Sequence, residues 1–496
     1  MVPQPQAPFA YLCKVTPNDR YQVVIGLEVH AQLLTKSKLF SGDSAAFSSD
    51  PNTNTSPITL AHPGTLPRMN RKVIEHAVRL GLALNCDIEQ HNYFARKNYF
   101  YPDLPKGYQV SQHTTPICKN GFVAINIGGT TRKIALNRIH IEEDAGKSLH
   151  EENDRYTGID LNRAGVPLLE IVSEPNLHSG EEAFVYLTEL RKLVRWLSVC
   201  DGNMEEGSMR CDANVSVRLM GETRLGTRVE VKNLNSIRNV KRAIEFEASR
   251  LIDLLENGQH IIQETRSFDA GAGTTFSLRS KEDADDYRYF PEPDLTPFHI
   301  TDEFLQKIKN DMPELPAKMQ ERFTGELHLS EYDASVLCGE REQAEYFEKI
   351  IGYTINVKAA ANWMMGPVRN YLNENKANIS SLQLPPEKIA ALISLVDQGK
   401  LSFGTASSSI FSALLAYPNK DPITLAASLD LLQETGSSSI GEWIDTVINA
   451  MPAKVAEYKK GKKGLLALFA GEVKKLSKGR ADMQTVNRLL EQKLNN

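Results

Sequence analysis

The 496-residue chain is too long for one hydrophobic core, and its length predicts about two to four domains. Its composition, with 41% hydrophobic and 24% charged residues, is that of an ordinary globular protein. No apolar run approaches the roughly 18 residues that cross a bilayer, so we expect no membrane partner. The six cysteines include no CxxC pair, which disfavours disulfides and thiolate zinc sites and favours a reducing compartment.

The net charge of −5 is unevenly distributed along the chain. Residues 450–496 contain eleven Lys and Arg but four Asp and Glu, so an acidic body ends in a basic tail. A basic end suits a polyanion, and Gly461 and Gly464 lie among the lysines where a phosphate could approach the backbone. The alternative is an ordinary solvated helix face.

The first segments of the chain predict a leader followed by a strand. Residues 1–20 lack the apolar core of a signal peptide, and we expect them to be disordered. Residues 21–34 alternate with period two, which predicts a strand with Glu28 and His30 on one face. This carboxylate and imidazole can converge on one ion; the alternative is an exposed pair at a sheet edge.

Segment 96–109 interleaves aromatic rings and prolines with basic and amide side chains. Stacking surfaces beside cations suit a nucleotide or the end of an RNA. The alternative is a packed loop whose Tyr hydroxyls find local partners.

Segment 138–148 starts as a strand and ends in three consecutive carboxylates, followed by Ala and then Gly-Lys-Ser. The glycine spacing of a Walker loop is absent, so we reject a P-loop. Crowded carboxylates usually need a cation, and Lys147 beside them could meet a phosphate. Strict alternation from Arg138 would place Glu142, rather than Glu143, on the face of His140.

Glu170 lies inside the apolar run 166–172, where an ionised carboxylate without a partner is costly. Two partners are open at this point: Arg163, in a satisfied core ion pair, or a metal ion.

Segment 203–218 predicts the strand around which the others are organised. From Arg210 it alternates, with Cys and aliphatic residues on one face and a polar row on the other: Arg210, Asp212, Asn214, Ser216 and Arg218. Such a row can hold anions, a metal, or both; the alternative is a solvated outer strand. Amphipathic helices are predicted at 181–199 and 236–257.

Polar strand faces of this kind recur from residue 21 to residue 294, including Arg228, Glu230 and Lys232 on the strand predicted at 226–234. One antiparallel sheet with an acidic and basic basin on one face accounts for the recurrence. After residue 293 the sequence becomes helical with Pro punctuation, and a basic helical unit begins near 401. We interpret Trp363, Met364 and Met365 as helix core.

Seven motifs, in this order, resemble the family of B subunits of the bacterial-type aspartyl/glutamyl-tRNA(Asn/Gln) amidotransferase. They are IGLEVH at 25–30, KNYFYPD at 97–103, EEDAGK at 142–147, DLNR at 160–163, MEEGSMRCDAN at 204–214, EVKNLN at 230–235 and DDYRYFPEP at 285–293. The resemblance implies an α+β fold: an antiparallel-sheet cradle domain at 21–294, an all-α helical domain at 295–400 and a small all-α tRNA-binding tail domain at 401–496.

The resemblance also implies an ATP- and Mg²⁺-dependent carbon–nitrogen ligase. The side-chain carboxylate of Glu-tRNA(Gln) or Asp-tRNA(Asn) would be phosphorylated in the cradle. Ammonia from glutamine, released by the amidase (glutaminase) partner in a complex that also holds a small third protein, would then displace the phosphate. Since carboxylate oxygen leaves poorly, the acyl phosphate supplies the leaving group. The chain has no amidase signature of its own, so ammonia must come from a partner.

Carried over by position, the resemblance implies roles for nine residues. The metal group comprises Glu28, His30, Glu143 and Glu170; the catalytic group comprises Glu143, Asp212, Lys97 and Arg210; and Lys97, Lys147 and Asn214 contact ATP. Placing Glu143 beside His30 requires a bulge or strand end near Glu142. A histidine is an atypical ligand for Mg²⁺, so His30 could act through water.

One departure from the family concerns zinc. Some relatives carry two Cys pairs in the region corresponding to 41–63, but this loop has no cysteine, so we expect no structural zinc. Two other functions remain open: a non-catalytic tRNA-binding scaffold, and a stand-alone metal-dependent hydrolase, which the basic tail disfavours. We expect a cytoplasmic protein, with an organelle stroma or matrix as the alternative.

Overall fold

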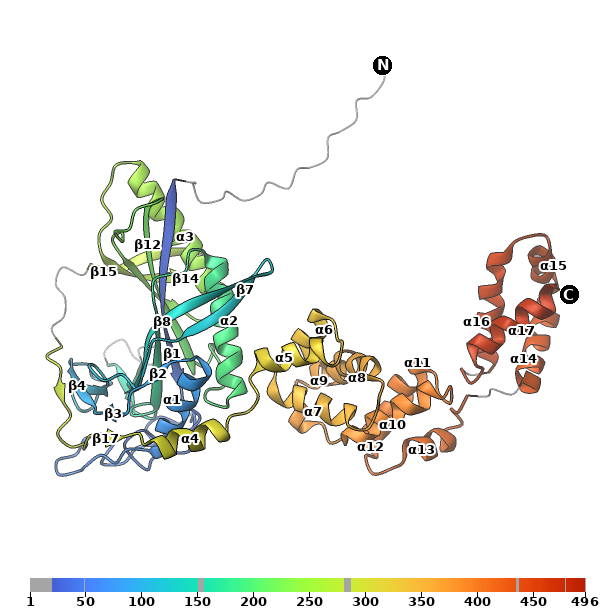
Figure 1. Cartoon of the computed structure of the whole chain (residues 1–496), viewed down its shortest axis with the longest axis horizontal. Helices are drawn as coiled ribbons and strands as arrows, with labels where there is room; N and C mark the ends of the chain where they lie inside the picture. The colour runs from blue at the N-terminus through green and yellow to red at the C-terminus, as the bar shows by residue number, and fades with distance from the viewer. Residues whose placement is uncertain are drawn as a thin grey trace, which may run out of the picture. The chain divides into compact units, whose positions relative to one another are not determined.

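The computed structural model describes residues 20–48, 50–149, 156–280, 287–433, 437–477 and 479–495, so the predicted leader lies outside the described residues except for Arg20. The chain divides into two compact units (Figure 1). The first ends at Leu315 and is called the sheet unit; the second begins at Pro316 and is called the helical unit. No helix within the described ranges is long and apolar enough to span a bilayer.

A large sheet forms the centre of the sheet unit. Its strand order is β15-β14-β13-β12-β1-β11-β8-β6-β2, with β7 paired to β8. The strands are β1 (Tyr21–Gln32), β2 (Asp87–Ile88), β6 (Cys118–Lys119), β7 (Phe122–Ile127), β8 (Thr130–Glu143), β11 (Pro167–Ser173), β12 (Met209–Leu219), β13 (Val229–Leu234), β14 (Glu264–Asp269) and β15 (Thr274–Ser280). Strand β1, predicted from its alternation, lies between β12 and β11.

The sheet departs from the expected antiparallel pattern at one place. Strands β13 and β14 pair in parallel, whereas the other described pairs in this sheet are antiparallel. The long helix α3 (Ile237–Glu256) connects β13 to β14 and returns the chain to the same edge. A parallel pair needs such a crossover.

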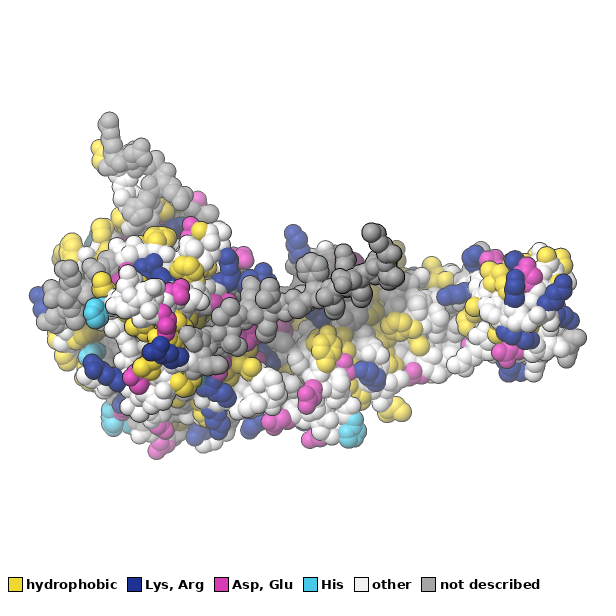
Figure 2. Space-filling view, turned by 90° about the horizontal axis from the view of Figure 1, so that it is seen from above, with side chains coloured by type: hydrophobic (Ala, Val, Ile, Leu, Met, Phe, Trp, Pro, Cys, Tyr) yellow, Lys and Arg dark blue, Asp and Glu magenta, His cyan; other side chains and the backbone are white. Residues whose placement is uncertain are grey.

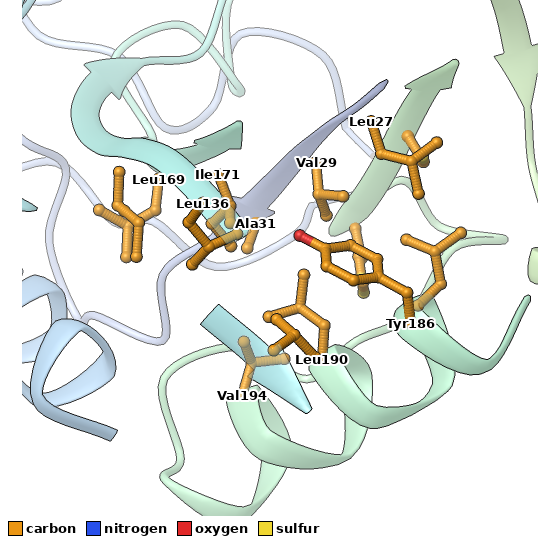
Figure 3. Packing of buried hydrophobic residues seen from close by; sticks show 14 of the residues in the cluster. Leu27, Val29, Ala31, Leu136, Leu169, Ile171, Tyr186, Leu190 and Val194 are labelled. Carbon is orange, nitrogen blue, oxygen red and sulfur yellow. The ribbon is translucent and has the colours of Figure 1, made fainter. Parts of the chain in front are cut away.

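The apolar face of β1 packs against helix α2 (Gly180–Trp196), which begins at the capping residue Ser179. Figure 3 shows Leu27, Val29 and Ala31 of β1 facing α2, which contributes Tyr186 and Leu190. All five are fully buried. Burying a large aliphatic side chain stabilises a fold by about 1.5–3 kcal/mol, so this core fixes which face of β1 turns away from the helices.

Three small sheets and helix α1 (Arg71–Ala83) complete the surroundings. Strands β4 (Ala95–Asn98), β5 (Tyr108–Ser111) and β16 (Phe290–Pro291) form one sheet. Strands β9 (Lys147–Leu149) and β10 (Gly158–Asp160) form a second, and β3 (His91–Asn92) pairs with β17 (Phe298–His299). The aromatic segment 96–109 thus contains most of β4, a turn and the start of β5.

The sheet unit extends beyond the predicted boundary at residue 294. Helix α4 (Asp302–Asn310) contributes Ile308 to the core of the sheet unit. Phe304 and Leu305 of the same helix pack against that core. The Arg71 guanidinium of α1 lies 5.4 Å from the ring centroid of Phe304. The apolar face of α4 therefore packs on the core of the sheet unit and does not begin a separate core.

The helical unit contains short helices with Pro and Gly between them. They are α5 (Pro316–Gly325), α6 (Glu331–Leu337), α7 (Arg341–Ile351), α8 (Val357–Trp363), α9 (Arg369–Glu374), α10 (Pro386–Asp397), α11 (Phe403–Thr405), α12 (Phe411–Ala416) and α13 (Pro422–Ser428). The helix-core interpretation is confirmed for Trp363 and Met364, which are buried, whereas Met365 is half-buried.

Four further helices, called the tail helices, pack around a core of their own: α14 (Ser437–Ala450), α15 (Pro452–Lys459), α16 (Leu466–Leu476) and α17 (Met483–Asn495). That core includes Ile440, Phe469, Val486 and Leu490. Figure 2 shows Lys and Arg side chains on the surface of this part of the chain, interspersed with acidic ones.

Candidate active site

The candidate site lies on the polar face of the large sheet, opposite the face that packs on α2. Strand registers bring its residues into line. His30 on β1 is opposite Glu170 on β11, and Glu170 is opposite His140 on β8. On the other side of β1, Glu28 is opposite Asp212 of β12. Side chains opposite one another on one face are neighbours, so residues far apart in sequence meet here.

Two histidines and two carboxylates, called the acid cluster, form the centre of this face: His30, His140, Glu142 and Glu170. His30 Nε2 lies 3.4 Å from Glu142 Oε1 and 3.6 Å from Glu170 Oε2. His140 Nε2 lies 3.2 Å from Glu170 Oε2 and 3.7 Å from Glu142 Oε2. Ligand atoms of His30, Glu142 and Glu170 all lie within 4.8 Å of one another, a spacing that one divalent cation can bridge.

Burial and mutual proximity set the protonation of the acid cluster. Burial lowers the pKa of His140, but Glu170 and Glu142 outweigh it and raise that pKa to about 9. The pKa of His30 is also raised: burial lowers it, and the hydrogen bond to Glu170 and the charge of Glu142 more than compensate. Burial raises the pKa of Glu170, yet the two imidazoles hold it well below its usual value. The carboxylates of the cluster therefore favour the protonated form of both imidazoles.

The Nδ1 of His140 is buried and has no hydrogen-bond partner among the residues that the structure describes. Buried polar atoms are normally bonded, so this nitrogen marks a place for a water molecule behind the cluster. The carboxylates of Glu142 and Glu170 and the imidazole of His30, whose ligand atoms converge, fit a hydrated divalent cation.

The structure brings Glu142 into the acid cluster, whereas Glu143, the residue implied by the resemblance, does not lie beside His30. No bulge interrupts the end of β8, because Glu142 pairs with Leu168 and Glu143 with Pro167 in regular register. Glu143 therefore turns to the opposite side, where its carboxylate accepts hydrogen bonds from Lys106 Nζ at 2.5 Å and Val110 N at 2.8 Å. The alternation from Arg138 was the signal that identifies Glu142 and His140.

A second acidic group lies beside the cluster, across β1. Asn214 Nδ2 donates to Glu28 Oε1 at 2.9 Å. Lys232 Nζ lies 2.7 Å from Asp212 Oδ2 and 3.1 Å from Glu230 Oε1. Burial, reinforced by Glu170, raises the pKa of Glu28. The structure thus places Glu28, Asp212 and Asn214 together on one face of the sheet. The Lys232 ammonium forms ion pairs with Asp212 and Glu230 at this place.

Two of the arginines named in the sequence analysis, Arg210 and Arg163, bind Asp144, next to the cluster. Arg210 Nη2 donates to both carboxylate oxygens of Asp144 at 3.0 Å. Arg163 Nε lies 3.5 Å from Asp144, and the guanidinium donates to the backbone oxygens of Ala145 and Gly146. The suggested core pair of Arg163 with Glu170 is therefore wrong, since His30 and His140 hold that carboxylate.

The two predicted lysines lie apart from one another. Lys97 Nζ is 4.7 Å from the ring centroid of Tyr287 and 5.6 Å from that of Tyr99. Burial, reinforced by Glu142, raises the pKa of Tyr99. Lys147 is exposed on the β9–β10 sheet, which is separate from the large sheet.

Two protein families match separate parts of the chain. Residues 23–306 match the family described as "GatB/GatE catalytic domain", and residues 345–494 match "GatB domain". The first match contains the acid cluster, Asp212 and Lys97.

Curated relatives match almost end to end. Proteins of Syntrophotalea carbinolica and Geobacter sulfurreducens are 47% identical to this chain over 477 residues, and one of Trichlorobacter lovleyi is 49% identical over 475 residues. Each alignment covers 96% of this chain and 99% of the relative, and each relative is named as the B subunit of aspartyl/glutamyl-tRNA(Asn/Gln) amidotransferase. The chain therefore belongs to the family of aspartyl/glutamyl-tRNA(Asn/Gln) amidotransferase B subunits.

Proposed function

We propose that this chain is the component of a tRNA-dependent amidotransferase that activates the side-chain carboxylate of misacylated Glu-tRNA(Gln), Asp-tRNA(Asn) or both. The observation that carries the proposal is the acid cluster, in which His30, Glu142 and Glu170 offer three converging ligand atoms. Family membership indicates the class of substrate, and the acid cluster provides ligands for the metal ion that phosphoryl transfer would need.

The chemical need is a leaving group. Ammonia does not displace oxygen from a carboxylate at neutral pH, whereas it displaces phosphate from an acyl phosphate. The reaction therefore uses ATP as phosphoryl donor, and amide formation releases phosphate. Phosphoryl transfer depends on positioning and on offsetting negative charge, which the polar face of this sheet can provide.

His30, Glu142 and Glu170 would hold a Mg²⁺ ion, and His140, behind Glu170, would orient that carboxylate. Bound there, the ion would offset negative charge on the transferred phosphoryl group. The side chains of the cluster hold their positions because strand pairing fixes β1 on both of its sides.

Residues next to the acid cluster would contact the phosphates and the substrate. Lys232 and Arg210, on the β12–β13 side, would contact phosphates, with Asp212 positioning Lys232 through its 2.7 Å contact. Asn214 orients Glu28. Lys97 would contact the substrate from the aromatic side of the cluster.

Two predicted residues take different places in the proposal. Glu143 acts with Lys106 and not with the ion, because its carboxylate lies on the opposite side of β8. Lys147 is left as an outer contact for a phosphate, because its side chain is exposed.

Ammonia would come from the amidase (glutaminase) partner, with a small third protein completing the complex. The sequence carries no amidase signature. The basic tail helices would bind the tRNA body through its phosphates, a salt-dependent contact. We propose that the complex works in the cytoplasm.

Label transfer tests this function. The full complex is given Glu-tRNA(Gln) and ATP labelled at the γ-phosphate, first without ammonium, when label should appear on the aminoacyl group, and then with ammonium, when label should leave as phosphate. Wild type and Glu222→Gln, which changes an exposed turn carboxylate, should both transfer label and form Gln-tRNA(Gln). Glu142→Gln and Asp212→Asn should each lose about 100-fold or more in rate, as for removed electrostatic groups in other enzymes. Full activity in both variants would leave the non-catalytic scaffold as the correct function.

A further inference from the structure

A row of five aromatic rings, called the aromatic row, runs beside the acid cluster. Its members in spatial order are His113, Tyr289, Tyr287, Tyr99 and Tyr101. The ring centroids of successive members are separated by 4.0, 6.1, 6.1 and 5.8 Å. His113 and Tyr289 stack in parallel, with 7° between their planes, whereas the other contacts are edge-to-face. The row thus ends in a flat, stacked pair.

The backbone holds the row in place. Asn98, at the end of β4, donates its backbone N–H to Tyr287 O at 3.0 Å and its side-chain amide to Arg288 O at 2.8 Å. Arg288 lies between the two tyrosines in the left-handed region, at φ 44°. Such a conformation is uncommon outside glycine and persists where its surroundings fix it. The platform is therefore preformed.

The row begins beside β8, because Gln112, which directly precedes His113, accepts a hydrogen bond at 3.0 Å from the backbone N–H of Ile141, the residue between His140 and Glu142. Burial raises the pKa of Tyr289 to about 12, and Tyr287, Glu170 and Glu142 add to the effect. His113 at the outer end of the row is exposed, as is Tyr101 at the other end. The stacked pair therefore extends from solvent to the edge of the cluster.

The cations are distributed unequally around the cluster. Lys232 and Arg210 lie on the β13 and β12 side, where a triphosphate would be stabilised. The aromatic side holds Lys97, whose ammonium lies over Tyr287. The side with Lys232 and Arg210 suits a polyphosphate. The aromatic side, with Lys97, suits a nucleotide base and a single backbone phosphate.

We propose that the aromatic row receives the unpaired 3′ end of the aminoacyl-tRNA and that its terminal adenine stacks on the His113–Tyr289 platform. The inference rests on the proposed function, because the aminoacyl ester is attached to that terminal ribose. A base on the platform brings the esterified side chain toward Glu142 and Glu170. Lys97 then lies where it can neutralise the preceding phosphate. Aromatic stacking is the usual way in which proteins hold an unpaired RNA base.

The test compares uncharged tRNA(Gln) with the same tRNA lacking its terminal adenosine, each as a competitor for the full complex. Wild type should bind the complete tRNA about ten-fold more tightly, within the range for one stacked base. Tyr289→Leu and His113→Leu should each reduce that preference to about two-fold or less. Tyr289→Phe keeps the ring and should restore the preference. Because His113 is exposed, its variant should fold normally even where a Tyr289 variant is destabilised.

The matched control is Phe276→Leu, which removes a half-exposed ring on β15, the strand at the far edge of the sheet. It should keep the ten-fold preference. Retention of the full preference in Tyr289→Leu and His113→Leu would overturn the inference. So would a rise in the KM for ATP with the preference intact, since the platform would then hold the base of ATP. Failure of the proposed function is a separate result: the wild-type complex would transfer no label from ATP.

Discussion

His140 and Glu170 face each other across the β8–β11 pair, with His140 Nε2 3.2 Å from Glu170 Oε2. His30, on β1 at the other side of β11, places its Nε2 3.6 Å from the same oxygen. Glu170 is thus held between two imidazoles from two strands. Its position is fixed before any ion binds, which limits the reorganisation that binding requires.

Glu142 and Glu143, which are adjacent on β8, provide a matched pair of variants that tests the proposed metal site. Glu142→Gln should lower Mn²⁺ affinity at least about ten-fold, because it removes a carboxylate that faces His30. Glu143→Gln should leave that affinity unchanged, because Glu143 bonds Lys106 on the opposite side. Isothermal titration of both variants measures the difference. Equal losses in the two variants would contradict the assignment of Glu142.

Metal affinity should rise with pH. The pKa of His30 is raised above its usual value of about 6.5, because the contacts with Glu170 and Glu142 outweigh burial, so a metal must compete with a proton for this imidazole up to a higher pH than usual. We expect affinity to increase by up to about ten-fold per pH unit between about pH 6 and the raised pKa. Titrations in buffers of different ionisation enthalpy measure the released proton. His30→Asn should release one proton fewer, and an unchanged release would place the proton elsewhere.

The loop at 41–63 should depend on Lys38. This side chain is fully buried, and its Nζ donates to Asn54 O at 2.7 Å and Leu161 O at 3.3 Å. Lys38→Met leaves both carbonyls without this donor and should cost about 2 kcal/mol of the free energy of unfolding. Denaturant unfolding measures the loss, and limited proteolysis should cut the loop faster. The exposed Lys36→Met is the control; equal stability of the two variants would refute the role of Lys38.

Acid should destabilise the sheet unit through His76. Burial lowers the pKa of this residue to about 4; Nε2 bonds Leu34 O at 3.2 Å, and Nδ1 is buried with no hydrogen-bond partner in the described part of the chain. Between about pH 4 and pH 6.5 the unfolded chain binds a proton that the folded chain does not, so stability is complete above pH 6.5 and falls as pH decreases. His76→Gln should remove on the order of 2 kcal/mol of that decrease, measured by denaturant unfolding across this pH range. The exposed His62→Gln should not.

The tail helices should contribute a salt-dependent part of tRNA binding. Changing the exposed Lys459, Lys460 and Lys474 to Gln should weaken tRNA binding by about ten-fold and flatten its dependence on salt. Any tRNA-independent ATPase activity should stay unchanged. The same change at three exposed lysines of α4 and α5 (Lys307, Lys309 and Lys318) is the control. Equal losses in the two triple variants would refute a specific role for the tail.

Local alternation predicted much of the site. The pattern in β1 and β12 placed Glu28, His30, Asp212 and Asn214 on one face, and the structure brings them together there. Glu143 was assigned by family position against the alternation of its own strand. The strand continues in register to its last residue, so the local pattern was the better guide.

Long-range contacts could not be derived from the sequence in the same way. The partner of Arg163 is Asp144 because the turn after β8 brings them together, and no periodicity contains that information. The end of the sheet unit at Leu315 depends on where the apolar stripe of α4 docks. An apolar stripe indicates that a helix packs against a core, but it does not indicate which core.

The uninterrupted end of β8 makes the site sensitive to chain length as well as to composition. Because side chains change face at every residue, one inserted or deleted residue between Leu136 and His140 would turn Glu142 and Glu143 each to the opposite face. Glu142 would then leave the acid cluster, and Glu143 would leave Lys106, although neither residue is substituted. An odd change in the number of residues in this strand should therefore disrupt the site even when every side chain of the acid cluster is kept.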